Sequence, residues 1–363
     1  MRGRAASRAH GPSVPVILHS KPWISRSDIE SLAATLRGGM LAQGETTALF
    51  ERRLADWFGT ESPGVAAASG SAAIVMSLLA LEVGSGDEVI VSSYNCSKVL
   101  EAVLTVGAVP VLADMGEHWM CDADKVRPLV SRRTKAIVIP HLLGIFSPVR
   151  DFLGWGVAVI EDCAQAIGAM GAHRIQGDIA IFSFHPTKLI TTGEGGMAIT
   201  PRRELADRMR RIRDGEGGWR SGRLFAPMSD LAAALGVNQL ERYPEILKRR
   251  RGFGLRYLDA LKRVVPQAVA NFPIERSMFF RLPLDLEGGT DRYQDAFLQR
   301  GVRVSRGVDA LLHRARNLPD ATFEQSVRLF DRTLCLPIYP ALSEAEFDHC
   351  VAAATALLRD APG

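Results

Sequence analysis

The sequence feature that most constrains the fold is a regular alternation of short apolar, β-rich runs with helix-like stretches. Strands are predicted at residues 65–68, 88–92, 109–112, 135–139, 157–161, 179–184 and 196–200. Helices are predicted near residues 71–82, 96–106, 122–131 and 202–213. This alternation is typical of α/β proteins and predicts a mostly parallel sheet with helices on both faces. The run at 196–200 follows a short glycine-rich loop, which also suits an antiparallel strand.

The segments on either side of this alternation predict a three-part chain. Upstream, Ser27 to Glu30 has the pattern of a capping box, and Gly38–Gly39 marks the end of that helix. From about residue 245 the pattern changes to mixed segments, including a strand-like run at 276–284 and a final helix from Ser343. We therefore expect a disordered tail at 1–20, a large domain at 21–240 and a smaller α+β domain at 241–363.

Composition excludes several classes of protein. The 363 residues carry a net charge of +4 and are 47% hydrophobic, which is ordinary for a globular chain and too weakly basic to indicate nucleic acid. No window approaches the length of apolar sequence that a transmembrane helix needs. The five cysteines are odd in number and show no CxxC spacing, which predicts reduced thiols in a cytoplasmic protein without a metal site.

A candidate anion site lies where the strand at 65–68 meets the following helix. Ser69, Gly70 and Ser71 open that helix, whose unpaired N–H groups and positive dipole end attract a phosphate. Glycine permits close approach, and Ser71 adds a hydroxyl. The alternative is an ordinary Ser-Gly-Ser turn that only caps the helix.

A pair of carboxylates ends the strand at 157–161. Glu161 and Asp162 follow Ile160, and ligands of parallel sheets bind outside the carboxyl ends of the strands. An aspartate there can hold a pyridinium nitrogen in its protonated form, so that the ring acts as an electron sink. The alternative is an aspartate that caps the loop.

The run from Ile181 to Lys188 places a lysine just after a predicted strand, in a loop rich in glycine and threonine. A lysine after a strand usually faces solvent, but here two apolar strands flank the loop. A partly desolvated amine has a lowered pKa and becomes a good nucleophile toward carbonyl groups. Lys188 is therefore a candidate to form a Schiff base.

These segments together resemble the DegT/StrS-type nucleotide-sugar aminotransferases. The resemblance runs in order from about Pro22 to Leu358, and it is carried by SGSAAI, GDEVIVSSYN, IEDCAQAIGA, FSFHPTK, TTGEGGMAIT and LCLPIYPALSEAEFDHC. It implies a fold type I enzyme that uses pyridoxal 5'-phosphate (PLP) to aminate keto sugars. It also implies a homodimer with active sites at the interface, and glutamate or glutamine as amino donor.

The resemblance also implies roles for particular residues. Lys188 matches the Schiff-base lysine and Asp162 the partner of the pyridine nitrogen. Gln165 matches the amide beside the phenolic oxygen of the ring. The phosphate would be held by Gly70, Ser71 and Ser183. His185 is a candidate substrate contact, with a packing role as the alternative.

The sequence departs from the family pattern in two loops. Cys96 stands where relatives stack an aromatic side chain on the cofactor ring, and Tyr94 is an alternative for that role. Phe225 stands where relatives have an asparagine that reaches the phosphate in the neighbouring subunit. Arg223, or Arg220, is the expected compensating cation.

The prediction is therefore a PLP-dependent aminotransferase of amino sugar biosynthesis that acts on a nucleotide-linked keto sugar or on a related cyclic ketone. One alternative is a PLP-dependent sugar dehydratase, although such relatives carry histidine at the position of Lys188. Another is a PLP-binding partner subunit without catalysis. The basic run Lys248 to Arg251 suits either a nucleotide diphosphate or, more simply, a solvated helix face.

Overall fold

A computed structural model of the chain describes residues 16–168, 174–215 and 225–359. Its centre is a seven-stranded sheet in the order β1-β7-β6-β5-β4-β2-β3. In that sheet β7 pairs antiparallel with both neighbours, and the remaining pairs are parallel. The predicted mostly parallel α/β sheet and its antiparallel final run are thus confirmed. The strands are β1 (Val65–Ala67), β2 (Glu88–Ser92), β3 (Val109–Ala113), β4 (Thr134–Pro140), β5 (Ala158–Asp162), β6 (Ile179–Ser183) and β7 (Gly196–Ile199).

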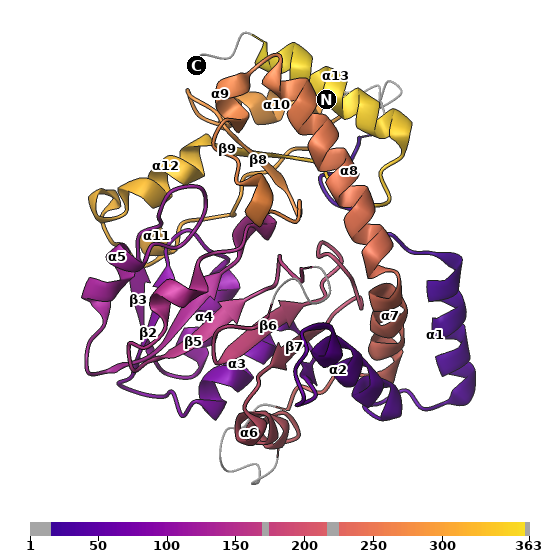
Figure 1. Ribbon diagram of the computed structural model, residues 1–363, viewed down its shortest axis with the longest axis vertical. Coiled ribbons are helices and arrows are strands. Elements are labelled where there is room, and N and C mark those ends of the chain that lie inside the picture. Colours follow the sequence, from indigo (N-terminus) through magenta and orange to yellow (C-terminus); the bar gives the residue numbers. More distant parts are fainter. Residues whose placement is uncertain (1–15, 169–173, 216–224, 360–363) are drawn as a thin grey trace, which may run out of the picture.

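Helices cover both faces of the sheet. Side chains alternate between the two faces along each strand, and apolar side chains on both faces need to be covered. Val65 and Ala67 of β1 pack on one side, whereas Ala66 packs on the other. The first side is covered by α3 (Gly70–Ala80), α4 (Ser97–Thr105) and α6 (Arg203–Arg213). The second is covered in part by α2 (Glu45–Trp57) and α7 (Asp230–Glu241). Figure 1 shows this layered half of the molecule at the bottom of the view.

The helix α1 (Arg26–Gly38) begins two residues earlier than the capping pattern suggested. Ser25, not Ser27, is the capping residue: its hydroxyl accepts from the N–H of Asp28, and the Asp28 carboxylate accepts from the N–H of Ser25. Asp28 is buried and is also bound by Gln239 and Arg242. These long-range contacts fix Asp28 in the capping box, which the sequence pattern cannot show.

Beyond α7 the chain leaves the sheet along the long helix α8 (Tyr243–Lys262), which Figure 1 shows running upward. At its far end β8 (Leu282–Asp285) and β9 (Thr333–Leu336) pair antiparallel. The predicted strand at 276–284 is wrong in its first part, since Phe279 has a φ of 55° and pairing begins only at Leu282. The remaining helices are α5 (Ala123–Val126), α9 (Pro266–Val269), α10 (Asp291–Gln299), α11 (Leu312–Ala315), α12 (Glu324–Arg332) and α13 (Glu344–Leu358), the last capped by Ser343.

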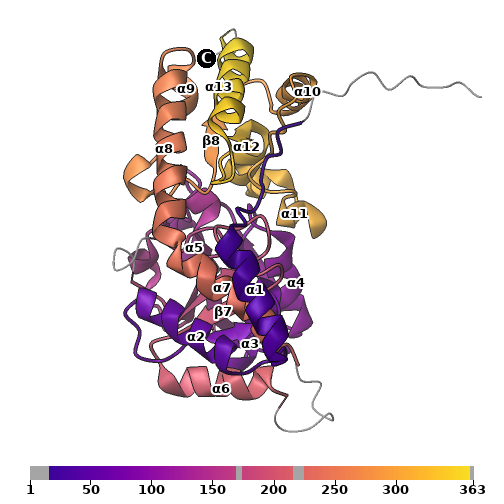
Figure 2. The same ribbon diagram turned by 90° about the vertical axis from the view of Figure 1, so that its right-hand side faces the viewer.

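The segment at 16–20 differs from the expected disordered tail. Ile17 is buried, and its backbone exchanges hydrogen bonds with Gly301 (2.8 Å) and Arg303 (2.9 Å). The segment around Ile17 thus packs on the C-terminal part, on residues that are far away in the sequence. Figure 2 shows this side of the molecule, with α1 toward the viewer. Residues 1–15 lie outside the described part.

The basic run in α8 is not a uniformly solvated helix face. Lys248 and Arg251 are exposed, but Arg250 is only 2% exposed and donates to the carbonyls of Phe280 and Ile338. The expectation of a solvated face is therefore wrong for Arg250. Among the described helices, none is long and apolar enough to cross a membrane.

Candidate active site

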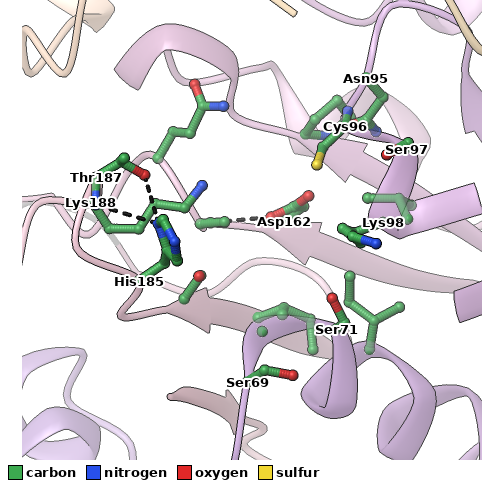
Figure 3. Close-up of a pocket in the computed structure, with 18 of the residues that line it drawn as sticks. Ser69, Ser71, Asn95, Cys96, Ser97, Lys98, Asp162, His185, Thr187 and Lys188 are labelled. Atoms are coloured by element: carbon green, nitrogen blue, oxygen red, sulfur yellow. Dashed lines mark hydrogen bonds between the residues drawn. The ribbon is translucent and has the colours of Figure 1, made fainter. Parts of the chain in front are cut away.

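A cavity of about 550 Å³ lies where β4, β5 and β6 end. This is the edge at which parallel sheets bind ligands. Figure 3 shows Lys188, His185 and Thr187 on one side of the cavity, and Cys96 and Lys98 on the other. All the predicted site residues line it, namely Gly70, Ser71, Cys96, Asp162, Gln165, Ser183, His185 and Lys188.

The first helix after β1 opens directly into this cavity. Ser69 caps α3 by accepting from the N–H of Ala72 at 3.1 Å, so α3 begins at Gly70. A Cβ at Gly70 would lie 2.9 Å from the Cβ of Ser183, so only glycine lets α3 approach β6 this closely. The N-terminus of α3 and the hydroxyls of Ser71 and Ser183 thus offer donors to an anion.

Asp162 is the last residue of β5 and is 8% exposed. One carboxylate oxygen, Oδ1, accepts the N–H of Ala164 at 3.0 Å. Burial raises the pKa of this carboxyl, while the Ala164 N–H and the charges of Lys188 and His141 oppose the shift. A ligand that brings a positively charged N–H would stabilise the ionised form.

Lys188 follows β6 in a loop that closes on itself. The N–H of Phe184 donates to Gly195 (2.9 Å), and that of Thr192 donates to Phe184 (2.9 Å). Removal from solvent lowers the pKa of the Lys188 amine, and the negative charge of Asp162 partly opposes this. Burial therefore increases the fraction of neutral amine, which is the nucleophilic form.

Gln165 is oriented by a backbone contact from the loop after β4. Its Oε1 accepts the N–H of Leu143 at 2.7 Å, and Leu143 adopts a left-handed φ of 58°. Because the carbonyl end is engaged, the amide nitrogen is the end that can donate to a ligand in the cavity. That orientation suits an acceptor such as a phenolic oxygen.

The two predicted candidates for ring stacking are clearly separated. Cys96 is exposed and lines the cavity. Tyr94 is fully buried, and burial raises the pKa of its phenol well above the usual range. A Cβ at Gly307, in the C-terminal part, would clash with its hydroxyl. The alternative that Tyr94 replaces the stacking aromatic is therefore wrong.

His185 and Phe225, the first described residue of the loop before α7, are both exposed. His185 is exposed, and its Nδ1 lies 2.9 Å from the Thr187 hydroxyl, which does not assign it a role. Phe225 is 74% exposed. The proposed compensating residues Arg220 and Arg223 lie outside the described residues.

The cavity also contains residues that the sequence analysis did not single out, namely Asn95, Lys98, His141, Glu194 and Asp309. His141 directly follows β4, so the strand-end argument could have found it. Asp309 comes from the distant C-terminal part and carries no local signal.

His141, together with the buried residues Glu161 and Cys163, forms a group that has the spacing of possible metal ligands. The Nε2 of His141 lies 3.0 Å from Glu161, and its Nδ1 accepts the N–H of Ser147. Both ring nitrogens are thus engaged, and we assign no metal to this group.

The arrangement fits PLP. The N-terminus of α3 suits the phosphate, Asp162 suits the ring nitrogen, Gln165 suits the phenolic oxygen, and Lys188 offers an amine of lowered pKa. This site, at the edge of a mostly parallel seven-stranded sheet followed by a smaller C-terminal unit, defines a fold type I PLP-dependent enzyme.

Comparison with known proteins gives the family. The chain belongs to the DegT/DnrJ/EryC1/StrS aminotransferase family, whose model matches residues 22–355. The spore coat polysaccharide biosynthesis protein SpsC of Bacillus subtilis (strain 168) is 30% identical over 380 residues, covering 94% of this chain and 97% of SpsC. The protein is thus a PLP-dependent sugar aminotransferase.

Solved structures agree with this fold. The putative sugar aminotransferase Spr1654 from Streptococcus pneumoniae, in its PLP form, has a TM-score of 0.86 at 24% identity, covering 96% of this chain and 100% of that one. The aminotransferase TlmJ from Streptoalloteichus hindustanus has a TM-score of 0.82 at 26% identity, covering 93% and 97%. The similarity therefore extends over the sheet and the C-terminal part alike.

Proposed function

We propose that this aminotransferase aminates a nucleotide-linked keto sugar, or a related cyclic ketone, with glutamate or glutamine as donor. The observation that carries the proposal is the pair formed by Lys188 and Asp162. Both lie in one cavity, where burial raises the pKa of Asp162 and lowers that of Lys188, and the charge of each residue partly opposes the shift in the other. A dehydratase of this family would need no such amine, so Lys188 favours amino transfer over dehydration.

Each residue has a role that follows from its contacts. PLP, when bound, would supply an electron sink. Asp162 holds the proton on the ring nitrogen, and Gln165 donates to the phenolic oxygen. Lys188 would hold the cofactor through its amine, and its Nζ is the group that would accept and return a proton. Gly70, Ser71 and Ser183 hold the phosphate.

The lining of the cavity suits a polar acceptor. Asn95, Lys98 and Asp309 add an amide, a cation and a carboxylate to the lining of the cavity. Lys98 already pairs with Glu101 at 2.6 Å, so a phosphate would have to compete with that carboxylate. Side chains that donate and accept hydrogen bonds are those expected for a sugar.

We also propose a homodimer with the site at the interface. Glu194 lines both the cavity and a neighbouring, mostly apolar groove of about 470 Å³, which is formed by residues such as Leu32, Met228 and Leu235. Large apolar side chains are exposed nearby on α1 and the loop that follows, namely Ile29, Leu36, Met40 and Leu41. Covering this surface with a second copy would remove it from water.

The decisive experiment uses the PLP-loaded protein. Borohydride reduction followed by peptide mapping should label Lys188, and Lys188→Ala should lose both the label and turnover. Glutamate or glutamine should convert the spectrum of the bound cofactor to that of its amine form without any keto sugar. A label on another lysine overturns the assignment of Lys188, and an unchanged spectrum with every common amino donor overturns the proposed donor reaction.

A further inference from the structure

A second, much smaller cavity borders the lysine of the active site. Its volume is about 10 Å³, which is room for about one water molecule or one monatomic ion. Lys188 lines this small cavity as well as the large one, so the two cavities share that residue. Figure 3 shows Lys188 from the side of the large cavity.

Segments that are far apart in the sequence meet at the small cavity. They are the N-terminal segment around Trp23, the loop after β6, the helices α7 and α8, and the turn after β9. The polar and charged side chains among its lining residues are Lys21, Lys188, Thr191, Gln239 and Arg250.

The charged residues that line the small cavity are all cationic. Lys21, Lys188 and Arg250 are present, and none of the described lining residues is an aspartate or a glutamate. Asp28 accepts from Gln239 at 2.9 Å, but it also pairs with Arg242 at 2.7 Å, so its charge is already balanced.

Further positive charge lies on the ring of Trp23, which is another lining residue. The guanidinium carbons of Arg242 and Arg249 lie 4.5 Å and 5.2 Å from the centre of that ring. The electrostatic potential in the small cavity therefore favours a negatively charged ligand.

Arg250 has donors that the protein does not use. Its Nη1 donates to the carbonyls of Phe280 (3.2 Å) and Ile338 (2.8 Å). The Nε is buried, and neither Nε nor Nη2 donates to a group in the described part of the chain. Because a buried donor without an acceptor is costly, a ligand that accepts hydrogen bonds here would be stabilised.

The charge of Arg250 is retained despite its burial. Removal from solvent and, to a smaller extent, the charge of Arg281 lower its pKa to about 9, so the guanidinium stays protonated near pH 7. The phenol of Tyr243 opposes this shift, and no carboxylate does so. A buried cation without an opposite charge favours an anion over a neutral water molecule.

The start of the described chain adds no negative charge. The hydroxyl of Ser20 lies 3.5 Å from the carbonyl of Thr187, next to Lys188. His19 is neutral near pH 7, because burial and the charges of Arg281 and Arg303 hold its pKa at about 3. The segment 19–23 is therefore neutral or cationic.

We propose that the small cavity binds one chloride ion, whose charge acts on the Lys188 amine. A monatomic anion suits the volume, whereas phosphate and carboxylate groups are too large for it. An ion in this position stabilises the charged form of the amine and so opposes the effect of burial on its pKa. The inference does not depend on which amino donor or acceptor the enzyme uses.

Crystals of the full chain soaked in sodium bromide give the most direct test, because bromide scatters anomalously and is close to chloride in size. We expect one anomalous peak in the small cavity, within hydrogen-bond distance of the Arg250 guanidinium. A water molecule at that position, or no peak there, overturns the proposal.

The second test measures thermal unfolding in chloride and in gluconate at equal ionic strength. Excess inorganic phosphate is present to occupy the N-terminus of α3. Chloride should raise the unfolding temperature in a saturable way, because an ion that binds only the folded chain stabilises it. Arg250→Lys keeps the charge but removes the Nε, and it should raise the half-saturating chloride concentration about tenfold or more.

The matched control is Arg249→Lys on the same helix. Arg249 donates to the carbonyls of Pro340 and Leu342 but does not line the small cavity, so this variant should respond to chloride like the parent. Equal half-saturation in Arg250→Lys and the parent overturns the proposal. If Arg250→Lys does not fold, the bromide peak in the parent decides.

The action on Lys188 is measured in the cofactor-free protein with pyridoxal, which lacks the phosphate, so that chloride cannot compete at the phosphate position. The rate of reaction rises with pH as the amine loses its proton. Chloride should move the midpoint of this profile to higher pH by about half a unit or more. The other charges that act on this amine are the same in both salts, namely Asp162, Cys96, Arg281 and Asp309. The same midpoint in chloride and in gluconate overturns the action on Lys188.

Discussion

The Nδ1 of His313 lies 2.6 Å from the hydroxyl of Ser93, a contact that joins two segments 220 residues apart. The Ser93 oxygen also accepts the backbone N–H of His313 at 3.2 Å, so its own proton donates to Nδ1. The Nε2 of His313 then donates to Asp320 at 2.8 Å. Ser93 and His313 are fully buried, so this chain of hydrogen bonds fixes the loop that precedes α4.

That loop turns Tyr94 into the core and leaves Cys96 in the cavity, which predicts a selective thiol reactivity. Cys96 is the exposed cysteine, and the other four are buried. We expect one fast-reacting thiol per chain in the cofactor-free protein, measured with a chromogenic disulfide reagent. PLP should slow that reaction several-fold, because the thiol borders the ring site.

Cys96→Ser is the matched control for this measurement, and it should abolish the fast phase without changing the slow ones. Burial raises the pKa of Cys121 and Cys335 to about 12, so both stay protonated and unreactive. Full thiol reactivity that PLP leaves unchanged would mean that Cys96 does not face the bound cofactor.

Gly70→Ala should weaken cofactor binding. The added methyl group would lie 2.9 Å from the Cβ of Ser183 and 3.2 Å from its hydroxyl oxygen, so α3 and β6 must move apart at the phosphate position. We expect the dissociation constant of PLP to rise by about tenfold or more, since hydrogen bonds to a charged group contribute about 1.5–3 kcal/mol.

The control for this substitution is Gly38→Ala, at the end of α1, where a Cβ meets nothing within 4 Å. It should leave PLP binding unchanged. Equal dissociation constants for Gly70→Ala and the parent, measured by fluorescence titration, would remove the N-terminus of α3 from the phosphate site.

His19 predicts a specific loss of stability in acid. Its pKa is about 3 in the folded protein and 6.5 in an unfolded chain. Between these values the unfolded chain binds the extra proton, so the free energy of unfolding falls as the pH falls below 6.5. The decrease attributable to this one group is at most about 1.4 kcal/mol per pH unit.

His19→Gln should flatten that dependence, as measured by urea unfolding at a series of pH values. His349→Gln is the control, because His349 is exposed on α13 and, among the described residues, its side chain bonds to the Arg300 carbonyl alone. A pH profile that is as steep in His19→Gln as in the parent would assign the acid sensitivity to other groups.

The core of the site could be predicted from sequence because its residues are local to strand ends. Asp162 ends β5 and Lys188 follows β6, and parallel strands bring such ends to one edge of the sheet. Gly70 is likewise fixed by its place between β1 and α3. The place of such residues in the site can be predicted once the strands are assigned correctly.

The remaining features depend on contacts that no local pattern encodes. Arg250 lies in a basic run that resembles a solvated face, and only the packing of α8 on the C-terminal part buries it. Tyr94 and Cys96 are two residues apart, and the contact between Ser93 and His313 decides which of them faces the cavity.

Asp162→Asn should separate cofactor binding from catalysis. The substitution preserves the volume of the side chain but removes the charge that keeps the ring nitrogen protonated. We expect PLP to remain bound through the phosphate site and Lys188, while turnover falls by two or more orders of magnitude. Such a fall corresponds to a loss of about 3 kcal/mol or more of transition-state stabilisation, which is the scale of an electrostatic contact in a desolvated site. Borohydride labelling of Lys188 should persist.

The cofactor-free form of this variant gives an independent readout. Because burial raises the pKa of Asp162, ionisation of that carboxyl opposes folding at neutral pH, so cofactor-free Asp162→Asn should unfold at a temperature no lower than the parent. The control Asp178→Asn removes a carboxylate that binds the Val159 N–H near the opposite ends of β5 and β6, and it should retain turnover. Parent-like turnover in Asp162→Asn would mean that this aspartate only caps the end of β5.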